Sequence, residues 1–330
     1  MKILFSGDAF IDEKISLSDE LIDLIESNDL FVINFEGVIT KAIETRIDKA
    51  SSFRIDISNL VHLQKQINTE IVVSLSNNHM FDFGESGLKE CIEILEDNDF
   101  KCLINSLIIN ENENKEEDIC LYAFTSDEPS VMSVMESKEH CFYNYYDDIA
   151  VNKQQQSIAI CHWGDEYVSV PPHRIMTRAQ KMSDTFDLVI GHHPHVIQGV
   201  KSFENTKVYF SLGNFYLKGF NYKNGALHVF PQECYLGILV SYDTKERISE
   251  AYGCRYDEKK KEVLLSNEAT NHFVARSEEI KCDSKTAHIR WEKSYYEYLK
   301  FRRNVFVNLK SIYPKYKKLL WNSLRKIFAS

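Results

Sequence analysis

Short apolar runs alternate with amphipathic segments along most of the chain. Short apolar runs bounded by polar residues are typical of buried strands, whereas apolar residues at every third or fourth position predict helices. We expect strands at Ile3–Phe5, Leu30–Phe35, Ile71–Leu75, Ile119–Phe124, Ser157–Cys161, Phe186–Ile190, Lys207–Leu212, Leu236–Tyr242 and Glu262–Leu265. We expect helices at Ser18–Ser27, Asn59–Ile67, Ser86–Glu96 and Arg174–Ser183, with Ser18 or Asp19 and then Ser58 as the first two caps. This alternation predicts a layered α/β fold.

Side chains that can bind metal ions come directly after the predicted strands. They are Asp8, Glu36, Asn78, His79 and His162. In layered α/β folds, ligand sites lie beyond the carboxyl ends of strands, where loops from distant parts of the sequence meet. Mixed oxygen and nitrogen donors suit Mn, Fe or Zn better than Ca or Mg. The pattern therefore predicts a divalent metal site, with two ions sharing a carboxylate as one arrangement of these donors.

The stretch 191–200, GHHPHVIQGV, has three histidines within four residues, His192, His193 and His195. It follows the apolar run Phe186–Ile190, and we expect Gly191 to turn the chain there. Protonated imidazoles this close together repel one another, whereas a bound metal ion keeps them neutral. A polar loop of hydrogen-bonded histidines is the alternative, and the donors at the other strand ends favour the metal.

Charge is unevenly distributed over the 330 residues. The formal net charge is −10, but residues 291–330 hold ten Lys and Arg against two Asp and Glu, a net of +8, which leaves −18 on the first 290 residues. An acidic body argues against a nucleic-acid binder, because phosphate contacts need a basic surface. We expect one domain over residues 1–290 and a basic helical tail over residues 291–330.

The tail has apolar and aromatic residues at helical spacing, with Lys and Arg on the opposite faces. The series is Tyr295, Tyr298, Val305, Leu309, Ile312, Tyr316, Leu320, Leu324 and Phe328. A basic amphipathic helix predicts a peripheral membrane contact or a partner-protein contact. The alternative, which we slightly favour, is a helical pair that docks on the acidic body.

The chain gives no sign of secretion or of a membrane span. None of the eight cysteines forms a CxxC pair, and the opening MKILFSGDAF is too short an apolar run for a signal-peptide core. No run approaches the roughly eighteen apolar residues of a membrane helix. We expect a cytoplasmic protein, with the tail as its means of reaching the membrane surface.

Six separately placed motifs occur in one order, each after a predicted strand. They are Gly7-Asp8, Asn34-Phe35-Glu36, Asn77-Asn78-His79 with Asp82 and Gly84, His162-Trp163-Gly164 with Glu166-Tyr167, GHHPHVIQG, and SLGNF at 211–215. Over about residues 2–240 this set resembles the CapA branch of the calcineurin-like metallophosphoesterases, which is associated with capsule and poly-γ-glutamate biosynthesis. The resemblance implies an α/β fold, a metallophosphoesterase-like four-layer β-sandwich flanked by helices.

The resemblance also implies a role for each donor. Its implied ligands are Asp8 and His195 for a first ion, Asn78, His162 and His193 for a second, and Glu36 for both. His79 is implied as the general acid that protonates the leaving group. The chain departs from the wider superfamily at Phe10, which stands where the D-x-H pattern has a histidine. The first ion therefore lacks one ligand.

Six further residues have supporting roles, or substrate contacts, in this interpretation: Asn34, Asp82, His192, Arg54, Trp163 and Asn214. Asp82 either orients His79 or caps the following helix, and we favour neither role over the other. Arg54 contacts an anionic substrate or forms a surface ion pair. Trp163 and Tyr167 form an aromatic wall for the substrate or, as we favour, pack beneath the loop that carries the three histidines (the histidine loop). Asn214 hydrogen-bonds to a metal ligand.

These observations predict a metal-dependent hydrolase with phosphoesterase-type chemistry, acting on an anionic polymer or a phosphoester in the synthesis of a capsule or another cell-surface polymer. Two alternatives remain open. One is a hydrolase of γ-glutamyl amide or glycan linkages, and the other is a non-catalytic assembly protein of a capsule polymer complex. Fold and metal site are shared by many chemistries, so the sequence does not specify the substrate.

Overall fold

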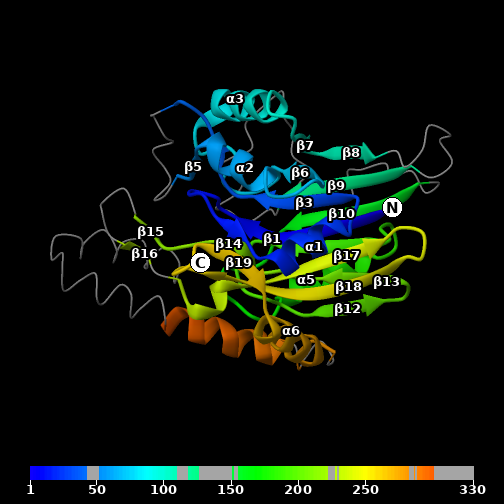
Figure 1. Cartoon of the computed structure of the whole chain (residues 1–330). Coiled ribbons are helices and arrows are strands. Elements are labelled where there is room, and N and C mark those ends of the chain that lie inside the picture. Colours follow the sequence, from blue (N-terminus) through cyan, green and yellow to red (C-terminus); the bar gives the residue numbers. More distant parts are fainter. Residues whose placement is uncertain are drawn as a thin grey trace.

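The computed structural model describes residues 1–42, 52–109, 118–125, 151, 155–221, 227–228, 230–281, 286 and 288–300. Two β-sheets pack face to face, and helices cover their outer faces (Figure 1). The predicted α/β sandwich flanked by helices is therefore confirmed. Residues 301–330, the larger part of the predicted tail, lie outside the described residues.

The larger sheet contains the first strand of the chain at its centre. In spatial order its strands are β2 (Ser16–Leu17), β19 (Glu262–Leu265), β18 (Ile248–Asp257), β17 (Leu236–Asp243), β1 (Lys2–Ala9), β3 (Leu30–Phe35), β6 (Glu70–Ser74) and β7 (Lys101–Leu103), and β14 (Asn214–Tyr216) also pairs with β1. Strands β1, β3, β6 and β7 are parallel. Their carboxyl ends therefore lie along one edge.

The smaller sheet has a parallel centre as well. Its strands, in order, are β12 (Val200–Phe203), β13 (Thr206–Tyr209), β11 (Leu188–His192), β10 (Gln156–His162), β9 (Ile119–Thr125) and β8 (Ser106–Ile109). Strands β9, β10, β11 and β13 are parallel. Two further pairs are β4 (Val38–Ile39) with β5 (Arg54–Ile55), and β15 (Phe220–Asn221) with β16 (Leu227–His228).

Alternation along the central strands divides the core into layers. In β1, Ile3 and Phe5 point into the core between the sheets, whereas Leu4 packs in the core under the helices. In β3, Val32 faces the inter-sheet core and Phe31 the helical side. Strands buried on both faces contain apolar runs, such as Ile3–Phe5 in β1 and Leu30–Ile33 in β3, and these runs allowed the strands to be predicted from the sequence.

Helices complete the outer layers. The outer face of the larger sheet is covered by α1 (Asp19–Glu26), α2 (Ile57–Gln64) and α3 (Gly84–Glu96), that of the smaller sheet by α5 (His173–Met182), and α6 (Asn267–Glu279) packs against β17 and β18. Ser18, one of the two predicted caps, caps α1, and Asp19 is its first residue. The prediction for α2 was wrong at its start, because Asp56 is the cap and its side chain accepts the Ser58 amide. Within the described ranges, no helix is long and apolar enough to span a membrane.

Gly191 does not turn the chain, contrary to expectation. It lies inside β11, and a Cβ there would be 2.1 Å from the carbonyl oxygen of Phe210. The glycine is required because the carbonyl group of Phe210, which follows the neighbouring parallel strand β13, approaches β11 too closely for a Cβ. The turn comes later, within the histidine loop itself.

Candidate metal centre

Strand pairing alone brings several of the predicted site residues next to one another. In β1, Asp8 pairs with Asn34 of β3 on one side and with Asn214 of β14 on the other. In the smaller sheet, His162 at the end of β10 pairs with His192 at the end of β11. Since these strands are parallel, both sheets present polar side chains at their carboxyl ends.

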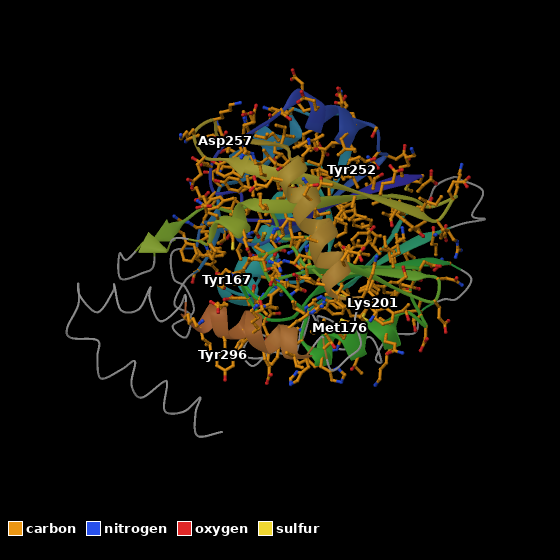
Figure 2. All side chains as sticks on the ribbon, turned by 90° about the horizontal axis from the view of Figure 1, so that it is seen from below. Tyr167, Met176, Lys201, Tyr252, Asp257 and Tyr296 are labelled. Carbon is orange, nitrogen blue, oxygen red and sulfur yellow. The ribbon has the colours of Figure 1, made fainter. Side chains whose placement is uncertain are left out.

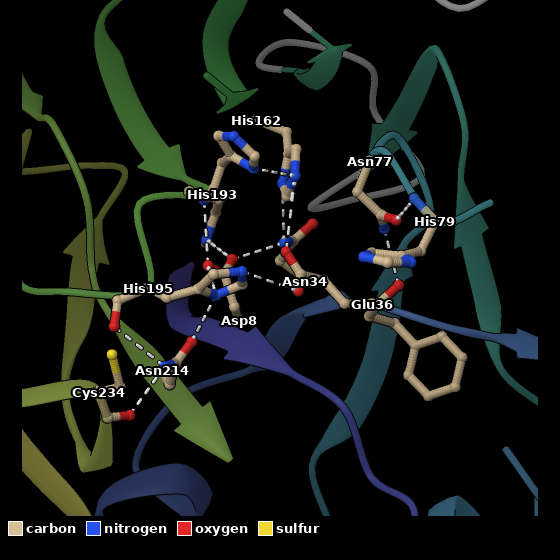
Figure 3. A network of polar contacts seen from close by, with 12 residues as sticks. Asp8, Asn34, Glu36, Asn77, His79, His162, His193, His195, Asn214 and Cys234 are labelled. Carbon is tan, nitrogen blue, oxygen red and sulfur yellow. Dashed lines mark hydrogen bonds and ion pairs between the residues drawn. The ribbon is translucent and has the colours of Figure 1, made fainter. Parts of the chain in front are cut away.

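Asp8 lies at the centre of this polar cluster and is 1% exposed. Its Oδ1 accepts a hydrogen bond from Asn34 Nδ2 (2.7 Å) and lies 3.2 Å from His192 Nδ1, and its Oδ2 accepts the backbone N–H of His193 (3.0 Å) and lies 3.2 Å from His195 Nδ1 (Figure 3). Burial raises the pKa of the Asp8 carboxyl, but the hydrogen bonds of His192 and His195 outweigh burial and hold it well below its usual value. The carboxylate is therefore ionised.

Glu36 lies between two imidazoles. Its Oε2 is 3.7 Å from His195 Nε2, and its Oε1 is 3.5 Å from His162 Nε2. Donor atoms of Asp8, Glu36 and His195 lie within 4.8 Å of one another, and all three residues are buried. Burial lowers the pKa of His195, but the charges of Glu36 and Asp8 overcome burial and raise it to about 10. Without another cation, His195 is thus protonated to balance these carboxylates.

His162 and His193 form a second group of donors. His193 Nδ1 lies 3.1 Å from His162 Nε2. Burial, followed by the charge of His193, lowers the pKa of His162 well below its usual value, and burial lowers that of His193 to about 4. Two neutral imidazoles at this distance need either an N–H donated from one to the other or a cation between their lone pairs.

The donor set fits a divalent transition metal. Two buried carboxylates and three imidazoles are the ligand types that Mn, Fe and Zn take in proteins. In the described part of the chain, Asn34 Oδ1 is buried beside Asp8 with no hydrogen-bond partner. A buried cluster of Asp, Glu and His side chains can therefore hold a metal ion here, and the unpaired Asn34 Oδ1 lies next to this cluster.

Backbone strain is concentrated in the histidine loop. His193 has φ = +95° and His195 has φ = +58°, values that residues other than glycine seldom adopt. Such conformations persist only where the surrounding structure determines them, and they cluster at functional sites. Here the Asp8 carboxylate fixes the His193 amide, and Asn214 Oδ1 lies 3.0 Å from His195 Nδ1. Asn214 also donates to the carbonyls of His195 and Cys234.

His79 lies on the loop after β6 and pairs with Asp82. The distance from His79 Nδ1 to Asp82 Oδ2 is 2.8 Å, and the same oxygen accepts the Phe53 amide at 2.8 Å. The Phe53 ring stacks on the imidazole with centroids 4.0 Å apart. Since α3 has Phe83 as its N-cap, Asp82 contacts His79 and does not cap the helix. Asn77 accepts the His79 amide and donates to the Phe35 carbonyl, joining this loop to the end of β3.

The remaining predicted residues lie around this cluster or apart from it. Asn78 is next to His79 and is 9% exposed, and its metal-binding role stays a prediction. Trp163 is buried, and its Nε1 donates to the Phe210 carbonyl (2.9 Å), so it packs beneath the histidine loop. Arg54 is exposed on β5 and its guanidinium donates to the Ala42 carbonyl, so its contact with substrate stays a prediction.

The sequence patterns indicated only part of the aromatic surroundings of the site. Nothing in the local sequence pattern around Phe53 indicates that its ring stacks on His79. Tyr167 has φ = +61° and its ring lies 5.9 Å from that of His195. Its place four residues after Trp163 in the HWGDEY motif was the one available signal.

Comparisons with known proteins identify a family and two relatives of this chain. A family model described as "Bacterial capsule synthesis protein PGA_cap" matches residues 12–218. The chain is 29% identical over 164 residues to a capsule biosynthesis protein CapA of Bacillus anthracis, covering 44% of this chain and 39% of that protein. It is 44% identical over 55 residues to a PGA biosynthesis protein CapA of Bacillus subtilis (strain 168), covering 16% and 14% of the two chains. The matches thus span less than half of these relatives.

Among solved structures, a hypothetical protein from Thermus thermophilus aligns with a TM-score of 0.41 at 14% identity, over 77% of this chain and 98% of that one. The family match begins just after Asp8 and contains every other residue of the metal cluster. Because it covers more than half of the chain, the chain belongs to the bacterial capsule synthesis protein PGA_cap family, which is linked to the metallophosphoesterase superfamily.

Proposed function

We propose that this chain is a metal-dependent hydrolase with phosphoesterase-type chemistry that acts in the synthesis of a capsule or another cell-surface polymer. The observation that carries the proposal is the buried cluster of Asp8, Glu36 and His195 beside the pair His162 and His193. Family membership and the names of the two Bacillus relatives support the biological setting.

Under this proposal the donors form two half-sites that share a carboxylate: Asp8 and His195 in one, His162, His193 and Asn78 in the other, and Glu36 between them. A bound divalent ion supplies Lewis-acid polarisation of a phosphoryl oxygen and activation of water at neutral pH. Phe10 stands at the histidine position of the D-x-H pattern, so the half-site of Asp8 has one protein ligand fewer than that pattern supplies. We therefore expect it to bind its ion more weakly than the other half-site.

His79 is the proposed general acid. With Nδ1 facing the Asp82 carboxylate at 2.8 Å, the proton for the leaving-group oxygen is carried on Nε2. The negative charge of Asp82 stabilises the imidazolium form that donates this proton, and the stacked Phe53 ring restricts rotation of the imidazole. General acid catalysis of this kind contributes about 10²- to 10⁴-fold to the rate.

The test combines metal analysis with turnover of bis(p-nitrophenyl) phosphate. We expect the wild-type chain to bind Mn²⁺ or Zn²⁺ stoichiometrically, to lose turnover with a chelator and to recover it on reloading. His193→Ala loses both metal and turnover, whereas His79→Ala keeps the metal and loses turnover about 10²-fold or more. His173, exposed at the start of α5, provides the control variant His173→Ala, which keeps both. Unchanged turnover in His79→Ala would refute its role.

The same preparation tests the two other functions. A metal-loaded chain that leaves every phosphoester intact but cleaves poly-γ-glutamate or a glycan would be a hydrolase of those linkages. A chain without stoichiometric metal and without turnover would be an assembly protein that retains the fold. We favour the phosphoesterase because the paired His79 and Asp82 follow β6, which is the parallel neighbour of the strand that leads into the metal donor Glu36.

A further inference from the structure

A chain of ring contacts runs from His79 to His195 along the outer side of the metal centre. Successive centroid separations are 4.0 Å for His79–Phe53, 5.0 Å for Phe53–Phe220, 5.9 Å for Phe220–Phe230, 6.0 Å for Phe230–Tyr167 and 5.9 Å for Tyr167–His195. Tyr167 and Phe220 are partly exposed, whereas the metal donors are buried. This arc of rings therefore joins buried residues of the site to side chains that are partly exposed.

Tyr167 takes its place in this arc of rings with a strained backbone conformation. Its φ of +61° is an outlier for a bulky side chain, and its amide donates to the carbonyl of Pro194 at 2.7 Å. Pro194 separates His193 from His195, so this hydrogen bond ties the loop after β10 to the histidine loop. Strain that is retained in this way at a site is characteristic of a functional constraint.

The start of the C-terminal tail extends the arc by one more ring. Residues 288–300 are helical, and the ring of Tyr298 lies 5.5 Å from that of Tyr167. On the same face, Trp291 Nε1 donates to the Asp165 carboxylate (3.0 Å), and Ser294 Oγ accepts the Ser169 amide (2.9 Å). Positions 291, 294 and 298 recur at helical spacing, so one face of this segment contacts the loop that carries Tyr167.

The opposite face of the same segment points to solvent. Tyr296, only two residues before Tyr298, is 64% exposed and lies on the outer side of the orange segment, whereas Tyr167 lies on the body side (Figure 2). In the described part of the tail, the face that carries Tyr298 is thus occupied by the body. Tyr298 itself is partly exposed, so its ring is accessible beside Tyr167.

We propose that Tyr298 and Tyr167 form a wall that binds a ring-bearing group of the substrate, so that the start of the tail belongs to the active site. The site would then select phosphoesters that carry a planar or sugar ring over those with a short alkyl group, because aromatic side chains stack on rings. This inference rests on the proposed function and names a substrate class for it.

The test measures binding rather than turnover. Phenylphosphonate and methylphosphonate, which share one anionic head group and are not hydrolysed as esters, are titrated calorimetrically into the Mn²⁺-loaded full chain. We expect phenylphosphonate to bind about three- to tenfold more tightly to the wild type, as expected for one favourable ring contact. Tyr298→Ala, or Tyr298→Leu, which keeps apolar bulk, should remove this preference by weakening phenylphosphonate alone.

The controls separate the possible failures. Tyr298→Phe retains the ring and should retain the preference, and Tyr296→Ala should behave as the wild type, with metal content unchanged in all variants. An equal preference in the wild type and in Tyr298→Leu, or no preference in the wild type, overturns the inference and leaves the proposed function intact. If neither phosphonate binds the metal-loaded chain, the proposed function fails and the inference fails with it.

Discussion

Removal of metal is expected to change how the stability of this protein depends on pH. In the metal-free protein, burial lowers the pKa of His195, but Glu36 and Asp8 raise it to about 10, against 6.5 in the unfolded chain. A raised pKa contributes stability that is fully present below pH 6.5 and is lost as the pH rises through 10. A metal ion on His195 requires the neutral imidazole, so the metal-bound protein has no such dependence.

The size of the effect follows from the linkage of one proton to folding. One proton bound in the folded but not the unfolded state changes the free energy of unfolding by about 1.4 kcal/mol per pH unit. Between pH 7 and 8.5 the metal-free protein should therefore lose about 2 kcal/mol, a sizeable part of the about 5–15 kcal/mol typical of a domain. His193, with a pKa of about 4, affects stability only below pH 6.5 and does not enter this window.

The assay is urea denaturation at several pH values, with a chelator or with excess Mn²⁺. Buried thiols such as Cys161, whose pKa burial raises, affect both forms equally and cancel in the difference between them. We expect a falling free energy of unfolding for the metal-free form and a flat one for the loaded form. Parallel curves for the two forms would refute the assignment of His195 as a ligand.

Three further predictions concern single residues. Gly191→Ala should lower the free energy of unfolding by about 3 kcal/mol or more, because a Cβ would lie 2.1 Å from the Phe210 carbonyl oxygen. A loss below about 1 kcal/mol in urea denaturation would contradict this close approach. Asn214→Leu should weaken metal binding about 10- to 100-fold in a chelator competition, since it removes the partner of His195 Nδ1. Asp82→Asn should lower kcat about 10²-fold with metal content unchanged, and loss of metal instead would be inconsistent with its pairing to the general acid.

Strand positions were predictable where both faces of a strand are buried. Leu30–Phe35 was predicted in full, because every residue of β3 is buried and all but Asn34 are apolar. The first strand was predicted too short, as Ile3–Phe5 instead of Lys2–Ala9. Its last residues pair with β3 and β14 through backbone groups, and such pairing does not depend on an apolar side chain.

Helix α6 and strand β18 are among the elements whose sequence pattern was too weak to be predicted. In α6, only Ala269, Phe273 and Ser277 are buried, so its apolar stripe is narrow and partly polar. The helix is positioned by long-range contact, because a Cβ at Gly199 would meet the Cα of Ser277 at 2.5 Å. Strand β18 alternates between buried and exposed residues irregularly, and its register comes from eight pairs with β17 rather than from its own sequence.

The donors could be anticipated from their places after strands, but their geometry could not. His193 and His195 adopt left-handed backbone conformations that no local pattern favours. These conformations depend on partners far away in the sequence, since Asp8 accepts the amide of His193 from 185 residues away. The geometry of the candidate metal centre therefore comes from tertiary contacts, and only the composition of the histidine loop could be used from the sequence.

The substitution at Phe10 shows how this chain differs from the D-x-H pattern. The Phe10 ring stacks on Phe53 with centroids 4.3 Å apart, and Phe53 in turn stacks on His79. Since Asp82 accepts both the Phe53 amide and the His79 imidazole proton, these rings and this carboxylate hold the proposed general acid from two sides. Restoring histidine at position 10 would therefore remove a ring from this stack while adding an imidazole next to the metal donors. Under the proposed function, position 10 would link leaving-group protonation to metal binding, and we expect a gain in one to lower the other.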